Sequence, residues 1–251
     1  MRSLVIRGGL LTQLCCLVSA VLAGGALAEP GSGPRGTVDQ TFTTTAPASP
    51  TGIGFTARYH AEGDPNSDPP FMERMVFFPP EGMRYDTRVP DACTASDLEL
   101  QASGPAACPE GSRLGGGTTQ GVFFVPFTDR VVLDRYTHNV YVMNNVKEQI
   151  VLVEAEGYSV LRGRFKRDGS LAFELPTCFP TPPTGECVED HVLQTATSTF
   201  LPEYTRTVDG EPRSYATTPP ACPASGYWET RVRLSWSTGD VDDVVTRQPC
   251  A

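Results

Sequence analysis

Cysteine pairs with the spacing of a zinc site are absent from this sequence, and histidine is scarce. No Cys-x-x-Cys occurs, and the three histidines are His60, His138 and His191. Structural zinc sites combine such cysteine pairs with histidines a few residues away. The pattern therefore argues against a zinc site.

The Gly-x-Ser-x-Gly motif of many serine hydrolases is also missing. A hydrolase site would have to be assembled from distant residues, and His191, which follows Glu189 and Asp190, is the best candidate for a catalytic histidine. The pattern favours an acidic surface loop instead, and no pair of carboxylates stands out for glycoside cleavage. We predict no catalytic residue.

Runs of lysine and arginine are missing, and acidic residues are in excess. The chain has 20 basic and 29 acidic residues, a formal net charge of −9. An acidic surface repels phosphate backbones and anionic lipid head groups. We therefore expect no nucleic-acid partner and no peripheral membrane binding.

Acidic residues are absent from the first 28 positions. Arg2 and Arg7 precede and flank the start of a largely apolar stretch from Leu10 to Val21, and Ala26-Leu27-Ala28 ends in the small residues that a signal peptidase requires. This pattern predicts a signal peptide at residues 1–28 and hence secretion. The alternative, a retained anchor, is disfavoured because the apolar stretch is short for a membrane span. We expect no membrane span in the mature chain.

Two of the eight cysteines, Cys15 and Cys16, lie inside the predicted signal peptide. Exported thiols with partners available oxidise, so the other six are expected to form disulfides, for which fifteen connectivities exist. Local spacing favours pairing in chain order: Cys93 with Cys108, Cys178 with Cys187, and Cys222 with Cys250.

Short strands separated by Gly and Pro turns are predicted along most of the mature chain. Their ranges are 37–45, 53–59, 75–78, 121–127, 139–143, 150–155, 158–165, 170–175, 191–200, 227–237 and 241–247. Asp168-Gly169 joins two of them as a tight hairpin turn. In the strand at 227–237 one face is apolar and carries Trp228 and Trp236, so we expect an antiparallel sheet packed on one side.

One short helix is predicted over residues 94–101. Thr94 is the expected N-cap, Asp97 follows three residues later, Leu98 is apolar, and Gly104-Pro105 ends the helix. Many strands and one helix predict an all-β fold, an antiparallel β-sandwich of immunoglobulin-like or jelly-roll-like type, stapled by disulfides.

The domain organisation expected is simple. Residues 29–36 are rich in Gly and Pro and are predicted to be a flexible tail, and residues 37–251 to form a single β-sandwich domain. A split near Pro180–Pro183 is the alternative.

Acidic turns supply the candidate metal ligands. Asp240, Asp242 and Asp243 lie in a predicted turn, and calcium prefers several oxygen ligands. The tract lacks the EF-hand spacing, and a solvated acidic turn explains it more simply. A second acidic loop, residues 62–68, is judged in the same way.

Adjacent phenylalanines supply a candidate ligand face. Phe123, Phe124 and Phe127 fall in one predicted strand, and Phe77 and Phe78 in another. Neighbouring residues of a strand point to opposite faces, so one ring of each pair could be exposed to a partner or a sugar. We expect instead that a second layer covers both faces.

Two segments carry a resemblance. One combines Cys93–Leu98 (CTASDL) with Gly104–Gly115 (GPAACPEGSRLG), and the other combines Pro219–Trp228 (PPACPASGYW) with Gln248–Cys250 (QPC). Together they resemble a group of uncharacterised secreted proteins of high-GC Gram-positive bacteria. The resemblance implies the pairings Cys93–Cys108 and Cys222–Cys250, and it implies no activity.

These patterns lead to an expectation of a secreted, non-enzymatic binding protein, with an extracellular protein or glycan as partner and association with the cell envelope as one setting. A secreted hydrolase, or a secreted inhibitor that presents the loop 179–186, are the alternatives.

Overall fold

The computed structural model describes residues 28–124, 136–154, 157–175, 179–181, 186–188 and 191–251. The predicted signal peptide lies outside the described residues, apart from Ala28. Within the described ranges, the structure contains no helix with the length and apolar character needed to span a bilayer.

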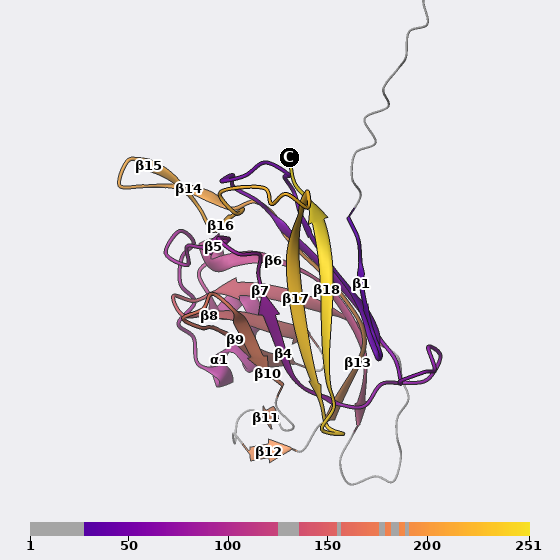
Figure 1. The fold of residues 1–251 in the computed structure, drawn as a ribbon. Coiled ribbons are helices and arrows are strands. Elements are labelled where there is room, and N and C mark those ends of the chain that lie inside the picture. Colours follow the sequence, from indigo (N-terminus) through magenta and orange to yellow (C-terminus); the bar gives the residue numbers. More distant parts are fainter. Residues whose placement is uncertain (1–27, 125–135, 155–156, 176–178, 182–185, 189–190) are drawn as a thin grey trace, which may run out of the picture.

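Twelve strands form one antiparallel sheet (Figure 1). In their hydrogen-bonded order across the sheet they are β1 (Gly31–Gly33), β2 (Gly36–Phe42), β3 (Ile53–Tyr59), β13 (His191–Leu201), β6 (Arg113–Phe124), β7 (Tyr136–Asn144), β8 (Glu148–Glu154), β9 (Tyr158–Phe165), β10 (Leu171–Glu174), β4 (Met72–Phe78), β17 (Tyr227–Trp236) and β18 (Val241–Pro249).

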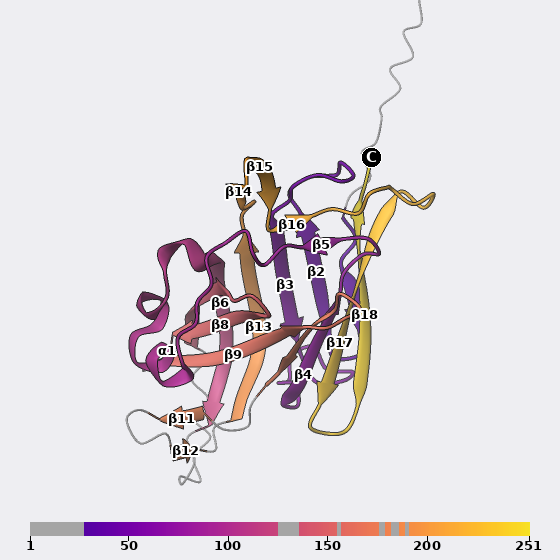
Figure 2. The ribbon, with the colours of Figure 1, turned by 90° about the vertical axis from the view of Figure 1, so that its left-hand side faces the viewer.

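The sheet curls until its first and last strands meet, and its two halves pack face to face (Figure 2). Phe55 of β3 contacts Phe77 of β4 edge to face across the interior, with ring centroids 5.0 Å apart. Tyr59 and Trp236 make a similar contact at 6.0 Å. The predicted all-β antiparallel fold is confirmed, and both of its layers belong to one continuous sheet.

Backbone and side-chain hydrogen bonds close the seam at which the first strands of the sheet meet its last strand, β18. Glu29 and Arg247 exchange two backbone hydrogen bonds of 2.8 and 2.9 Å. The backbone N–H groups of Gln40 and Phe42 on β2 donate to side-chain oxygens of Thr246 and Gln248 on β18. Side chains thus satisfy edge groups that would otherwise lie buried without a partner.

Residues 29–36 differ from the predicted flexible tail, because they form β1 and the turn into β2. Gly31 is buried, and a Cβ atom on it would lie 2.3 Å from the carbonyl oxygen of Val245. Glycine here permits β1 to approach β18 closely. The same residue type that indicates flexibility in the sequence is used for packing.

The strand with two tryptophans has the predicted faces. Trp228, Thr230, Val232, Leu234 and Trp236 are all buried, and the intervening residues are partly or fully exposed. The hairpin turn at Gly169 is also confirmed, with β9 and β10 paired and a φ of 81° at that glycine.

The one α-helix in the described ranges, α1 (Asp97–Ser103), covers the outer face of β8 and β9 (Figure 2). Its capping box consists of Ser96 and Glu99, two residues later than the predicted pair Thr94 and Asp97. Leu100 is the buried apolar residue, whereas Leu98 is 45% exposed. The predicted end of the helix at Gly104 is confirmed.

Among the cysteines that the structure describes, two disulfides form, Cys93–Cys108 and Cys222–Cys250, as predicted. The first links the segment before α1 to the segment after it, and the second links the two ends of the β17–β18 hairpin. Of the predicted pair Cys178–Cys187, Cys178 lies outside the described residues and the side chain of Cys187 is not described.

Three short two-stranded ribbons complete the fold. They are β5 (Arg84–Tyr85) with β16 (Ala216–Thr217), β11 (Phe179–Thr181) with β12 (Glu186–Val188), and β14 (Thr205–Val208) with β15 (Glu211–Ser214). In Figures 1 and 2 the β5–β16 ribbon crosses one end of the curled sheet.

Candidate ligand-binding cavity

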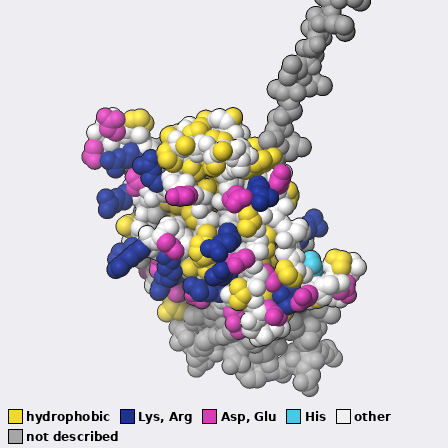
Figure 3. Space-filling model, viewed as in Figure 1, with side chains coloured by type: hydrophobic (Ala, Val, Ile, Leu, Met, Phe, Trp, Pro, Cys, Tyr) yellow, Lys and Arg dark blue, Asp and Glu magenta, His cyan; other side chains and the backbone are white. Residues whose placement is uncertain are grey.

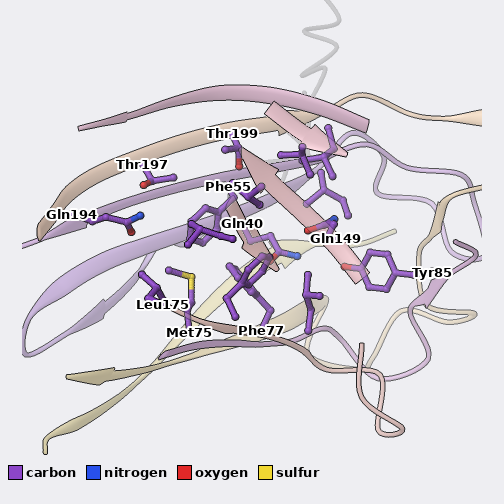
Figure 4. Close-up of a pocket in the computed structure, with 17 residues that line it drawn as sticks. Gln40, Phe55, Met75, Phe77, Tyr85, Gln149, Leu175, Gln194, Thr197 and Thr199 are labelled. Atoms are coloured by element: carbon purple, nitrogen blue, oxygen red, sulfur yellow. The ribbon is translucent and has the colours of Figure 1, made fainter. Parts of the chain in front are cut away.

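The inner faces of the curled sheet line a partly open cavity of about 130 Å³ (Figure 4). Its walls are mostly apolar and come from strands on both halves of the sheet, among them Phe55, Met75, Phe77, Val151, Leu161 and Phe173. Side chains at alternate positions of each strand point inward, which is why so many strands contribute. Apolar cavities of this size hold small apolar molecules.

Gly163 makes room for one wall of the cavity. It lies opposite Phe173 in the β9–β10 pair, and a Cβ on it would lie 2.3 Å from the Phe173 ring. The ring of Phe173 therefore occupies the space above the glycine and contacts Phe77, with centroids 6.2 Å apart. A side chain at position 163 would push this ring toward the cavity.

Gln40 places an amide group in this apolar setting. The residue is 5% exposed and lines the cavity from β2, between the apolar positions Val38 and Phe42. An amide can both donate and accept hydrogen bonds, so Gln40 marks a place where the polar group of a bound molecule could find a partner.

Two phenols and a second amide form a polar corner near β5. The Gln149 side chain donates to the Tyr215 hydroxyl at 2.9 Å, and the Tyr85 and Tyr215 rings lie 5.8 Å apart. Figure 4 shows Tyr85 reaching in from one end, toward Gln149. Burial raises the pKa of both phenols, so both keep their protons at neutral pH. Tyr85 is thus a hydrogen-bond donor.

The other end of the cavity is lined by β13. Gln194, Thr197 and Thr199 contribute polar groups there, and the Thr197 hydroxyl lies 2.9 Å from that of Thr119 (Figure 4). A register shift between Gln194 and Ala196 locally disrupts the pairing with β6. The cavity thus has apolar walls with hydrogen-bonding groups at a few points, the usual composition of a small-molecule site.

The predicted calcium ligands do not converge. Asp240 and Asp242 both accept hydrogen bonds from the guanidinium of Arg35, at 2.7 and 2.9 Å, and Asp242 also accepts one from Trp236 Nε1 at 2.9 Å. Arg35 is 7% exposed and Asp242 4%. The basic group that these two carboxylates surround is therefore an arginine side chain.

Asp243 points to the opposite, outer face of β18. It forms a two-point ion pair with Arg233, at 2.8 and 2.9 Å. This pair holds the pKa of the Asp243 carboxyl below its ordinary value. Basic and acidic side chains alternate over this face in Figure 3. Among the described residues no group of three potential ligands is placed to hold a metal ion, and a calcium site stays a prediction.

The acidic residues of the second loop, residues 62–68, also have separate partners. Glu62 is a third carboxylate on Arg35. Asp64 instead accepts hydrogen bonds from the Ser67 hydroxyl and the Asn66 backbone, which lower the pKa of its carboxyl. The loop thus contributes one ion pair to the seam and one local turn.

Among the three histidines, the side chains of His60 and His138 are described. The Nδ1 atoms of His60 and His138 lie 2.7 and 2.9 Å from the backbone carbonyls of Ala61 and Glu154. Glu189 and Asp190, which directly precede His191 in the sequence, lie outside the described residues, and so does Phe127. The side chains of His191, Phe123 and Phe124 are likewise not described.

Phe77 and Phe78 point to opposite faces, as strand geometry predicts. Phe77 lines the cavity, whereas Phe78 lies on the outer face, with the Arg231 guanidinium 4.0 Å from its ring centroid. The outer ring is therefore covered by an arginine side chain, where a second layer was expected.

The residues that distinguish this cavity, Gln40, Tyr85 and Gln149, are absent from the sequence-based candidates. One signal was available for Gln40, since it interrupts the inward face of a strand otherwise formed by Val38 and Phe42. Comparisons of the chain with protein-family models, curated proteins and solved structures give no match.

Proposed function

We propose that this protein is an exported, non-enzymatic binding protein that holds a small apolar molecule inside its curled sheet. The observation that carries the proposal is the largely apolar cavity between the two halves of the sheet, which Gln40, a residue only 5% exposed, lines with an amide group. Two disulfides and the signal-peptide pattern at residues 1–28 support export.

The chemistry of the cavity defines the molecule in outline. Phe55, Phe77 and Phe173 favour one ring or a short alkyl chain, and Gln40 and Tyr85 favour one oxygen-bearing group on it. Burying six carbons at about 0.8 kcal/mol each corresponds to a Kd of roughly 0.1–1 mM for a six-carbon probe. Affinities in this range are measurable by NMR.

Titration of ¹⁵N-labelled protein with hexan-1-ol tests the proposal. We expect saturable shifts of the side-chain amide signals of Gln40 and Gln149, because both line the cavity. The variant Thr199→Phe fills part of the cavity and should abolish these shifts. Ser198→Phe places the same ring on the exposed face of the same strand and should leave them unchanged. Unsaturable shifts, or equal loss in both variants, would refute the proposal.

Replacing the amide itself separates a binding role from a structural one. Gln40→Leu replaces the amide with an apolar group of similar size in a largely apolar wall, so the free energy of unfolding should change little. The affinity for hexan-1-ol should fall about threefold to tenfold, because its hydroxyl loses a partner. A destabilised variant that binds hexan-1-ol as well as the wild type would show that Gln40 serves the fold alone.

A further inference from the structure

A second hollow, of about 780 Å³, lies at the end of the sheet that the β5–β16 ribbon crosses. Three of the four charged side chains that line it are basic, namely Arg84, Lys166 and Arg213, and the fourth is Asp86. On a chain with a formal net charge of −9, this cleft is a local exception that attracts anions.

The cations of the cleft are only partly neutralised. Arg213 and Asp86 lie 3.7 Å apart. Arg84 forms no ion pair with any described residue. Asp168, two residues after Lys166 in the chain, accepts hydrogen bonds from the hydroxyl and backbone N–H of Ser170. These bonds, together with the charge of Lys166, lower the pKa of the Asp168 carboxyl, so Lys166 is partly neutralised as well. The Ser214 and Thr217 hydroxyls, 2.9 Å apart, add donors on the cleft wall.

Tyr85 lines both the cleft and the apolar cavity. Its ring packs against Phe165, which lines the cleft, at 5.3 Å, and against Tyr215 at 5.8 Å. Arg84 precedes it on the same short strand, where adjacent side chains point in opposite directions. One two-residue strand therefore contributes a cation to the cleft and an aromatic side chain that lines both the cleft and the cavity.

From this arrangement we infer that the ligand is an amphiphile with an anionic head group. Its apolar part would fill the cavity, its head would lie at Arg84, Lys166 and Arg213, and Tyr85 would form the threshold between the two. The inference rests on the proposed function and adds the class of ligand to it.

Four six-carbon probes with different head groups provide the test: hexanoate, hexyl sulfate, hexan-1-ol and hexylamine, titrated at pH 7 and low salt. Both anions should bind about tenfold more tightly than hexan-1-ol, and hexylamine more weakly. A preference for hexanoate alone would assign the head as a carboxylate, and one for hexyl sulfate alone as a sulfate- or phosphate-like group. Equal affinity of the anions and hexan-1-ol would overturn the inference and leave the proposed function intact. Failure of hexan-1-ol itself to bind would refute the proposed function.

Two triple variants separate the cleft from general electrostatics. Arg84→Gln/Lys166→Gln/Arg213→Gln should remove the tenfold preference for anions and leave the affinity for hexan-1-ol unchanged. Arg58→Gln/Arg74→Gln/Arg247→Gln changes the net charge equally at exposed positions on other strands and should keep most of the preference. An equal loss in both variants would show that no specific head-group site exists.

The orientation of bound hexanoate gives an independent check. Nuclear Overhauser effects should connect its terminal methyl group to the rings of Phe77 and Phe173, and the methylene next to its carboxylate to Tyr85. The reverse orientation would overturn the inference, even if the affinities follow the expected order.

Discussion

Arg35 and Asp242 are 207 residues apart in the chain, and their side chains form an ion pair of 2.9 Å in the structure. Both are buried, and the pair joins the turn between β1 and β2 to the start of β18. Trp236 Nε1 donates to the second carboxylate oxygen, so the buried charge is also hydrogen-bonded. The ion pair thus holds together the seam at which the first strands of the sheet meet β18.

Removing the arginine should open this seam. Arg35→Met leaves Asp242 buried without its cation, and we expect the free energy of unfolding to fall by about 3–5 kcal/mol in urea denaturation. The double variant Arg35→Met/Asp242→Asn should recover part of the loss. Arg233→Met, which breaks the exposed pair with Asp243, is the control and should cost less than about 1 kcal/mol. If Arg35→Met and Arg233→Met lowered the free energy of unfolding equally, the buried pair would contribute no more to stability than the exposed one, which would contradict its role at the seam.

Replacing Tyr59 with phenylalanine is expected to raise the free energy of unfolding. Its hydroxyl is buried and has no hydrogen-bond partner within the part of the chain that the structure describes, while its ring packs against Trp236. Tyr59→Phe keeps the ring and removes the uncompensated hydroxyl, so the free energy of unfolding should rise by about 1 kcal/mol. A loss of stability on this substitution, measured by urea denaturation, would show that the hydroxyl has a partner in solution.

The stability of the fold should fall above about pH 10. Burial raises the pKa of Tyr59, Tyr85 and Tyr215 in the folded protein, whereas the phenols of the unfolded chain titrate near 10. Above that pH the folded state binds more protons than the unfolded state, so the free energy of unfolding declines, by about 1.4 kcal/mol per pH unit for each phenol. Urea denaturation between pH 8 and 11 measures the slope, and Tyr59→Phe should reduce it by one proton. An unchanged slope in that variant would contradict the assignment.

Gly163 should not tolerate a side chain. The Cβ of Gly163→Ala would meet the ring of Phe173, so we expect a loss of about 1–3 kcal/mol in the free energy of unfolding. Shrinking the ring in Gly163→Ala/Phe173→Leu should make the combined loss smaller than the sum of the single losses. If thermal or urea denaturation showed that the two losses of stability simply add, Gly163 and Phe173 would not be in contact.

The disulfide between Cys222 and Cys250 should be a main source of stability for the β17–β18 hairpin. It joins residues with a sequence separation of 28, and in the chain-entropy model such a link contributes about 3–4 kcal/mol. Cys222→Ser/Cys250→Ser should therefore lower the urea midpoint markedly in the oxidised protein. Under reducing conditions the wild type and the variant should unfold alike, and a persistent difference would point to a packing effect of the serines.

Local patterns in the sequence suffice for most strands. The ranges 53–59 and 158–165 agree with β3 and β9 at both ends, because alternation and Gly or Pro turns are properties of neighbouring residues. The helix cap was misplaced by two residues, because Thr94 and Ser96 are both capping residues and only Ser96 has a glutamate three positions later. Glycines at 31 and 33 were misread as a tail, since close packing and flexibility use the same residue type.

The composition, the alternation of apolar residues and the cysteine spacing were enough to predict an antiparallel all-β chain with the pairs Cys93–Cys108 and Cys222–Cys250. Those features depend on residues close together in the chain. The closure of the sheet, the division of the three aspartates between Arg35 and Arg233, and the meeting of Gln40, Tyr85 and Gln149 around one cavity depend on the path of the chain between distant strands. A side chain's face on a strand follows from its neighbours, but its partner across the interior follows only from the way in which the sheet curls.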